Sequence, residues 1–553
     1  MFKSEMFKNE TFMGRIFLIL IPLITLTVSP YNSYDPLNVP KFSLLVMGAS
    51  ILGALLVSSK PLFPIKLPRL LGILLVLFVL QLFIVLMTSN APINQQIFGT
   101  FGRNTGLITY LSFVVVLLAA FKVSTESFAL SLSYTIVGTS IIFAAYCTLQ
   151  TFDFDPISWI NPYNPITGTL GNPNFASSFL AMSSCALLIL GIQHIKSIRI
   201  TLSIFVLIIS YLFLIYRSES IQGFLVFAIG AMTIFTIYIY FNGAIRKFLL
   251  PVLVFEGISS VVIILGILNK GPFSFLYKES IRQRGYYWDS AVEMMKLRPF
   301  SGVGLDSFGD WYYQVRSVDS AIQSPLITSS AAHNVFLDMG SNGGFPLFII
   351  YSGLIIYTFI AGVKFLKNST SINYAFTSIF TLWICYQAQS LISINQIGVA
   401  IWGWATTGLV IGFMKTNAND KTVSPQPKTK IKERNGGKLA GLCGLIIGLI
   451  IGLPPLLTDA NFRSAYTGNS AEKLILASSK YPEDIIRTLT TAEALAKSNL
   501  MEQSDLLLEH ILKVNPRLYG AWQLRYQISE PNSAAQIHAK SMLNKLNPQI
   551  KIK

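Results

Sequence analysis

"LLGILLVLFVLQLFIVLMT", residues 70–88, is a continuous apolar run that contains no charged residue. As an α-helix, a run of this length crosses a hydrocarbon core of about 30 Å and satisfies its own backbone hydrogen bonds there. The whole chain has the same character, because 52% of its residues are hydrophobic and only 12% are charged. Soluble proteins carry about 25% charged residues. The sequence therefore predicts an all-α polytopic membrane protein.

Similar apolar runs recur along the chain and predict about thirteen transmembrane helices. The predicted spans are 14–29, 42–58, 70–88, 106–121, 128–149, 174–193, 200–216, 221–241, 248–268, 343–363, 373–391, 396–414 and 439–457. They divide the chain into a membrane core of twelve spans at 1–414, a basic cytoplasmic linker at 415–438, the thirteenth span at 439–457 and a polar tail at 458–553. Within the core, a long loop at 269–342 separates the ninth span from the tenth.

The distribution of lysine and arginine predicts the orientation, because cytoplasmic loops retain basic residues. With a cytoplasmic N-terminus, the inner loops hold Lys60, Lys66, Arg69, Lys122, Lys196, Arg199, Arg246, Lys247, Lys364 and Lys367, and the basic linker adds more. The short outer loops hold Lys41, Arg103 and Arg217. The long loop and the tail are then extracytoplasmic. Most of the net charge of +16 follows from topology, so nucleic-acid binding has no support.

The tail has a weak internal repeat. Pro482, Pro516 and Pro548 end similar phrases at spacings of 34 and 32 residues, which is the period of tetratricopeptide helix pairs. We predict two to three divergent tetratricopeptide-like repeats with a protein-docking or acceptor-docking role. The alternative is a plain helical bundle that covers the membrane domain.

Two arginines are predicted at the outer ends of different hairpins. Arg103 lies in "FGTFGRNTGLITYL" and Arg217 in "LIYRSESIQGF". Each by itself fits a side chain that snorkels to lipid phosphates. Together they favour a shared anionic ligand, since guanidinium groups grip phosphate oxygens in a bidentate way.

The long loop contains a predicted amphipathic helix from about Ser280 to Leu297. On this helix Arg284, Trp288 and Met295 share one face. Tyr286, Tyr287 and Trp288 suit the depth of lipid headgroups. Arg284 is therefore a candidate for anion binding beside an aromatic anchor.

His333 lies in "SSAAHNVFL", residues 329–337, just ahead of the tenth span. An unperturbed imidazole titrates near neutral pH, so His333 is a candidate general base for a sugar hydroxyl. The alternative is a helix-start residue that caps or packs, with Asn334 beside it. The arginines predicted at the same membrane face favour the catalytic interpretation.

Five segments, in order, resemble the O-antigen ligase and polymerase superfamily of GT-C-type membrane glycosyltransferases. They are "GTFGRNTGLITYL", "GTLGNPNFASSFLAM", the outer-end arginine Arg217, "RGYYWDSAVEMMKLRPFSGVGLDSF" and "HNVFLDMGSNGGFPLF". The resemblance implies a bacterial inner-membrane enzyme whose donor is a polyprenyl-diphosphate-linked glycan.

By this resemblance, Arg217 and Arg284 hold the diphosphate and His333 acts as general base in an inverting transfer. Arg103, Asn172, Asn174, Trp288 and Asn334 are implied to line the substrate site. The two asparagines equally fit a turn and a helix N-cap. No metal or cofactor is implied, since the first outer loop offers only Asp35.

The leading hypothesis is transfer of the lipid-linked glycan to an extracytoplasmic glycan, lipid or protein acceptor. A polysaccharide polymerase and a protein O-oligosaccharyltransferase are alternatives within the same superfamily. A transporter is a different class, although transporters place charges within broken mid-membrane helices. A non-catalytic envelope-assembly scaffold is a further alternative.

Overall fold

The computed structural model describes residues 11–59, 67–159, 164, 166–267, 269–414, 436–468 and 470–550. Within these residues every regular element is a helix. Most of the predicted basic linker, residues 415–435, lies outside the described residues, as do Lys60 and Lys66.

A helix occupies the position of each predicted span. Nine of the described helices are long and apolar enough to cross a membrane. They are α3 (Asn38–Ser58), α4 (Arg69–Thr88), α7 (Glu126–Thr151), α8 (Pro173–Gln193), α9 (Ile198–Arg217), α10 (Ile221–Phe241), α11 (Leu249–Ile267, with the preceding turn η2, Arg246–Phe248), α15 (Val335–Asn368) and α19 (Gly436–Tyr466). Shorter helices at the remaining positions are α2 (Phe12–Leu26), α6 (Leu107–Lys122), α16 (Tyr374–Ser390) and α17 (Ile397–Phe413). The chain is thus a polytopic membrane protein.

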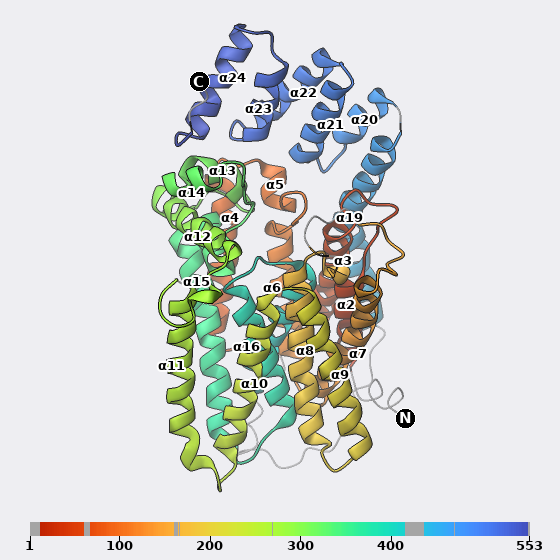
Figure 1. Cartoon of the computed structure of the whole chain (residues 1–553). Helices are drawn as coiled ribbons and strands as arrows, with labels where there is room; N and C mark the ends of the chain where they lie inside the picture. The colour runs from red at the N-terminus through yellow and green to blue at the C-terminus, as the bar shows by residue number, and fades with distance from the viewer. Residues whose placement is uncertain are drawn as a thin grey trace.

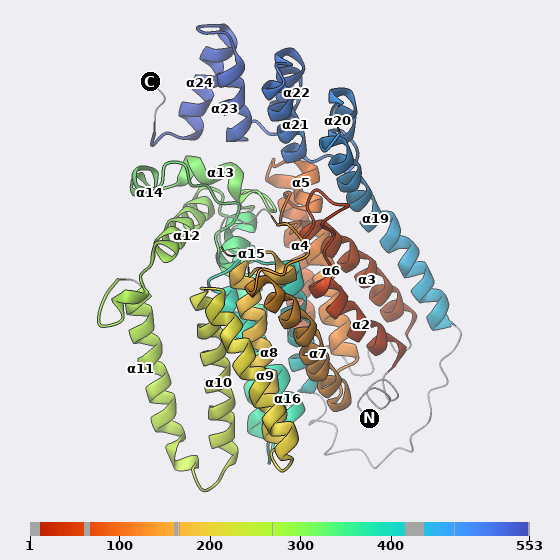
Figure 2. The same cartoon turned by 45° about the vertical axis from the view of Figure 1, so that its right-hand side comes forward.

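The helices form an elongated bundle around α17 and α8 (Figure 1). Every residue of α17 is buried, which matches its uniformly apolar sequence, since a helix that is apolar all round lies inside. By contrast, α11 stands at the edge of the bundle (Figure 2) and buries only Gly266. Its apolar side chains face outward, as expected of a helix that contacts lipid.

Lys41 lies in a helix instead of the predicted loop. It belongs to α3, and its side chain is fully buried. Its Nζ donates hydrogen bonds to the carbonyl oxygens of Thr25 and Thr27. These carbonyls lie at the end of α2, where the helix leaves its last carbonyls without intrahelical partners.

The long loop is folded into helices at one end of the bundle. It contains the turn η3 (Ser274–Leu276), α12 (Glu279–Leu297), α13 (Phe308–Val315) and α14 (Val318–Gln323), and the short helix α5 (Ile93–Phe98) lies at the same end (Figure 1). Helix α12 confirms the predicted amphipathic helix. Its buried face packs with α13 in a separate apolar cluster that includes Tyr287, Met294 and Tyr312.

The tail sits over this end of the bundle (Figures 1 and 2). It consists of α20 (Ala471–Ser478), α21 (Ile485–Lys497), α22 (Met501–Val514), α23 (Tyr519–Ile528) and α24 (Ala534–Leu546). Helix α19 continues past the predicted end of the last span to Tyr466 and so carries the chain into the tail. The tetratricopeptide-like character of these helices stays a prediction.

Candidate active site

A kink in α15 anchors the loop end of the bundle. Gly344 has φ +72°, and a Cβ there would lie 2.5 Å from the carbonyl oxygen of Pro299. The neighbouring Phe345 N–H donates to that same oxygen at 2.8 Å. Gly302 has φ +59°, and a Cβ there would lie equally close to the backbone of Asn342. Only glycine fits both positions without strain, so the segment after α12 rests directly on the kink.

His333 packs against α12 just ahead of the start of α15. Its backbone is left-handed, with φ 52°, and its ring packs over Tyr287 with a centroid distance of 5.3 Å. Tyr286 and Tyr287 are each only 8% exposed, and the Tyr286 hydroxyl donates to Asp319 at 2.5 Å. These tyrosines therefore pack inside the folded loop, and their depth relative to the lipid headgroups stays a prediction.

Arg103 is bound to two carboxylates. Its guanidinium lies 3.4 Å from Asp306 and 3.0 Å from Asp338, and it also donates to the carbonyl of Ser330. Asp338 in turn accepts from the backbone N–H of Ala332 at 2.8 Å. Burial alone would lower the pKa of Arg103, but the carboxylates of Asp306 and Asp338 outweigh burial and raise it. Arg103 thus fixes the residues that precede His333.

Two cations lie close enough to His333 to act on it electrostatically. Burial lowers the pKa of His333 to about 3, and the positive charges of Arg284 and Arg103 contribute to the decrease. Below neutral pH the imidazole therefore stays neutral, which is the form that accepts a proton. Burial also lowers the pKa of Arg284.

Helix α12 has three buried hydrogen-bond donors without a partner among the described residues, and Nε of Arg282 is one of them. Nε of Arg284 and Nε1 of Trp288 are both buried, and neither donates a hydrogen bond in the described part of the chain. A buried donor without a partner costs about 1–3 kcal/mol, so such groups require an explanation. A bound acceptor, such as a phosphate or sugar oxygen, would remove this cost.

Arg217 belongs to a different element, α9. It is the last residue of α9, and its side chain is exposed. Asn164 donates to its carbonyl oxygen at 3.3 Å. Among the described residues no hydrogen bond, ion pair or ring contact joins Arg217 to Arg284 or His333.

The predicted asparagines mostly shape the backbone. Asn172 is the N-cap of α8 and accepts from the N–H of Asn174 at 2.8 Å, which confirms the N-cap alternative. Asn174 accepts from the hydroxyl of Ser220, in the turn after Arg217. Asn334 caps α15 and donates to the carbonyl of Leu391 at the end of α16. It is Asn334, not His333, that caps this helix.

A comparison with known families identifies the segment that carries most of these residues. Residues 176–352 match the O-antigen ligase family. This segment of the chain is similar to O-antigen ligases. The matched segment is about a third of the chain and contains Arg217, Arg284, Trp288, His333 and Asn334. No curated protein matches the chain.

Asp338 and Tyr287 are neighbours of the candidate site that the sequence did not predict. Asp338 had a usable signal, because a carboxylate in the first turn of an apolar span is costly unless it is paired. Asp306 forms the second ion pair with Arg103, at 3.4 Å. In the described part of the chain, no cluster of three histidine, cysteine or acidic side chains could hold a metal ion.

Proposed function

We propose that this protein transfers a glycan from a polyprenyl diphosphate carrier to an acceptor hydroxyl on the extracytoplasmic side of the bacterial inner membrane. This refines the glycan-transfer activity that the O-antigen ligase family indicates. The proposed reaction inverts the anomeric carbon. Arginines supply the positive charge that a metal ion supplies in other transferases.

The proposed step is an in-line displacement. The acceptor oxygen forms a bond to the anomeric carbon, while the bond from that carbon to the diphosphate oxygen breaks. His333 takes the proton of the attacking hydroxyl, and polyprenyl diphosphate leaves with the bonding electrons. Arg284 and Arg217 would bind the diphosphate, whose negative charge grows as the bond breaks.

One observation supports this proposal more than the others. The neutral His333 imidazole lies near Arg284, whose Nε has no partner among the described residues, and Nε1 of Trp288 likewise has none there. A general base and an anion-binding group are thus adjacent. A bound diphosphate would offset the positive charges of Arg284 and Arg103 that lower the pKa of His333. The imidazole would then become more basic when the substrate is in place.

The other predicted site residues take positioning roles in this proposal. Arg103 holds the segment before His333 through Asp338 and Ser330. Asn174 holds the turn beside Arg217 through Ser220. Asn334 fixes the start of α15. None of these roles requires a contact with substrate.

The first test is His333→Ala in the native host, with membrane levels of the protein followed by immunoblot. We expect the lipid-linked glycan to accumulate and the transferred product to disappear. His538→Ala is the matched control, since His538 is an exposed residue of the tail and its loss should leave product unchanged.

The missing product separates the alternatives. If glycan chains of normal length remain on the carrier but are no longer transferred to the acceptor, the protein is a ligase. If long chains no longer form on the carrier, it is a polymerase. If glycoprotein is lost, it is a protein O-oligosaccharyltransferase. Unchanged product in His333→Ala would contradict the proposed mechanism and favour a scaffold or a transporter.

A further inference from the structure

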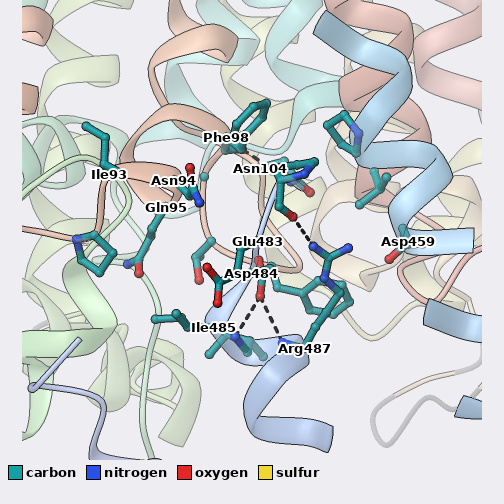
Figure 3. Close-up of a pocket in the computed structure, with 18 of the residues that line it drawn as sticks. Ile93, Asn94, Gln95, Phe98, Asn104, Asp459, Glu483, Asp484, Ile485 and Arg487 are labelled. Carbon is teal, nitrogen blue, oxygen red and sulfur yellow. Dashed lines mark hydrogen bonds between the residues drawn. The ribbon is translucent and has the colours of Figure 1, made fainter. Parts of the chain in front are cut away.

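A pocket lies between the membrane domain and the tail (Figure 3). Asn94, Gln95 and Asn104 line one side, and Glu483, Asp484 and Arg487 line the other. The first three come from α5 and the loop that follows it, and the last three from the start of α21. The pocket exists only because the tail is folded over this end of the bundle.

Two buried polar atoms in this pocket lack partners. Asn104 is 7% exposed and its Oδ1 accepts no hydrogen bond in the described part of the chain, and Arg487 is 4% exposed with a free Nε. One is an acceptor and the other a donor, and both residues line the pocket. Leaving both without partners is unfavourable, so the pocket is suited to a ligand that both donates and accepts hydrogen bonds.

The remaining lining narrows the class of ligand. Asn94 makes no hydrogen bond to the described residues, and Glu483 bonds to His510 at the pocket rim. Phe98 and Phe101 provide aromatic surface. Amide and carboxylate groups beside aromatic rings match a pyranose, which has hydroxyls around its edge and C–H groups on its faces.

Charge argues for a neutral sugar. Asp459, Glu483 and Asp484 are the acidic residues that line the pocket, and Arg487 is the only basic residue among those that line it. The carboxylate of an anionic sugar would be repelled by these acidic side chains, and such repulsion is stronger in a partly buried site.

A single loop connects the pocket to the candidate active site. In residues 99–105, Thr100 and Asn104 line the pocket, whereas Arg103 binds Asp338 and Ser330 beside His333. The backbone N–H groups of Thr100 and Thr105 both donate to Asp306, at 2.8 and 3.1 Å. The two sites therefore share one rigid wall.

We propose that this pocket binds a neutral pyranose residue of the acceptor, a subsite that rests on the glycan-transfer function proposed above. The sugar would contact Asn104 and Arg487 through its hydroxyls. The acceptor is the chosen partner, rather than the donor, because the tail builds half of the pocket and Arg284, the group proposed to bind the donor diphosphate, does not line it.

The test uses the full-length protein in lipid nanodiscs and saturation-transfer NMR. The probes are the methyl glycosides of glucose, galactose and N-acetylglucosamine, with the methyl glycoside of glucuronic acid as the anionic comparison. Asn94→Trp fills the pocket without removing a hydrogen bond to the described residues. Glu483→Gln is the second variant, and Glu502→Gln is its matched control on the exposed face of α22.

We expect a signal from at least one neutral glycoside and none from the glucuronide. Asn94→Trp should reduce that signal about tenfold, equivalent to about 1.4 kcal/mol of binding, and should reduce product in the native host. Glu483→Gln should weaken the signal and Glu502→Gln should not.

The proposal is overturned if no neutral glycoside binds to the wild-type protein, or if Asn94→Trp binds it as the wild type does. His333→Ala distinguishes this result from failure of the proposed function, because that variant should lose transfer and still bind the sugar. If Asn94→Trp keeps full transfer while His333→Ala loses it, the pocket is not an acceptor subsite and the catalytic proposal stands.

Discussion

At the scale of single residues, the state of His333 depends on its neighbours rather than on its own chemistry. A free histidine has a pKa of 6.5, and burial with Arg284 and Arg103 nearby lowers the pKa of His333 to about 3. The residue is consequently neutral over the whole physiological range. In this setting a histidine is a proton acceptor that cannot become a competing cation before the anionic substrate arrives.

This gives a pH prediction for the free enzyme. The plot of kcat/KM against pH reports the pKa of the free enzyme's base, so the acid limb of the wild type should fall well below the pH 6.5 of an ordinary histidine. Arg284→Met removes one of the charges that lower the pKa of His333. Its acid limb should therefore move to higher pH, in addition to an overall loss of rate.

Arg282→Met is the control for that experiment. Arg282 lies on the same helix and pairs with Glu279, and it is not among the groups that lower the pKa of His333. An acid limb near pH 6.5 in the wild type, or an equal shift in both variants, would contradict the role of Arg284.

Arg103 gives a prediction for stability. Arg103→Leu leaves Asp306 and Asp338 buried without their counter-ion, and breaking a buried ion pair in this way costs about 3–5 kcal/mol. We expect a clear decrease in the unfolding temperature of the detergent-solubilised protein. Adding Asp306→Asn and Asp338→Asn to Arg103→Leu should restore part of the loss, because neutral side chains no longer demand a partner. A triple variant as unstable as the single one would argue against the ion pairs.

At the scale of elements, the kink of α15 determines how the folded loop meets the membrane helices. The backbone oxygens of Ser341 and Asn342 accept from Val303 and Gly304 at 2.8 and 3.2 Å. Gln81 of α4 donates to the carbonyls of Phe300 and Gly343. The kink thus releases carbonyl groups that a straight helix would use internally, and the loop after α12 satisfies them.

Gly344→Ala tests this arrangement. A left-handed alanine costs about 1–3 kcal/mol, and its Cβ would also clash with Pro299. We expect a lower unfolding temperature together with loss of transfer. Gly353→Ala in the same helix is the matched control, since its Cβ would meet only Leu74 at 3.4 Å. Equal behaviour of the two variants would contradict a special role for the kink.

At the scale of the whole molecule, the tail is docked on the folded loop. Arg517 lies over the ring of Trp311 at 3.3 Å and donates to Gln314. Tyr519 packs against Tyr313 with ring centroids 4.4 Å apart. These contacts join the tail to α13, which packs against α12 and so against the candidate active site.

Arg517→Ala should loosen this contact, since a cation–π pair contributes about 0.5–2 kcal/mol. We expect faster hydrogen exchange in α13 and easier proteolytic release of the tail. Arg525→Ala is the control, because Arg525 pairs with Asp505 and Glu509 within the tail. If α13 exchanges equally in both variants, the tail does not stabilise the loop.

The sequence by itself determined the class of this protein and the position of its helices. Apolar runs long enough to span a bilayer must form helices, because the backbone finds no other hydrogen-bond partners in lipid. The sequence also predicted the amphipathic helix α12, because the spacing of apolar residues along a helix is a local property of the chain. The family motifs also marked Arg284, Trp288 and His333 before any geometry was known.

Only the tertiary structure decided which of these residues meet. Asp306 and Asp338 are 32 residues apart in the sequence, yet both bind Arg103, which lies more than 200 residues earlier. Likewise, the burial of Tyr287 and the neutral state of His333 arise from helices that pack together in space. Charges and donors act over a few ångströms, so their partners are set by folding and not by their spacing along the chain.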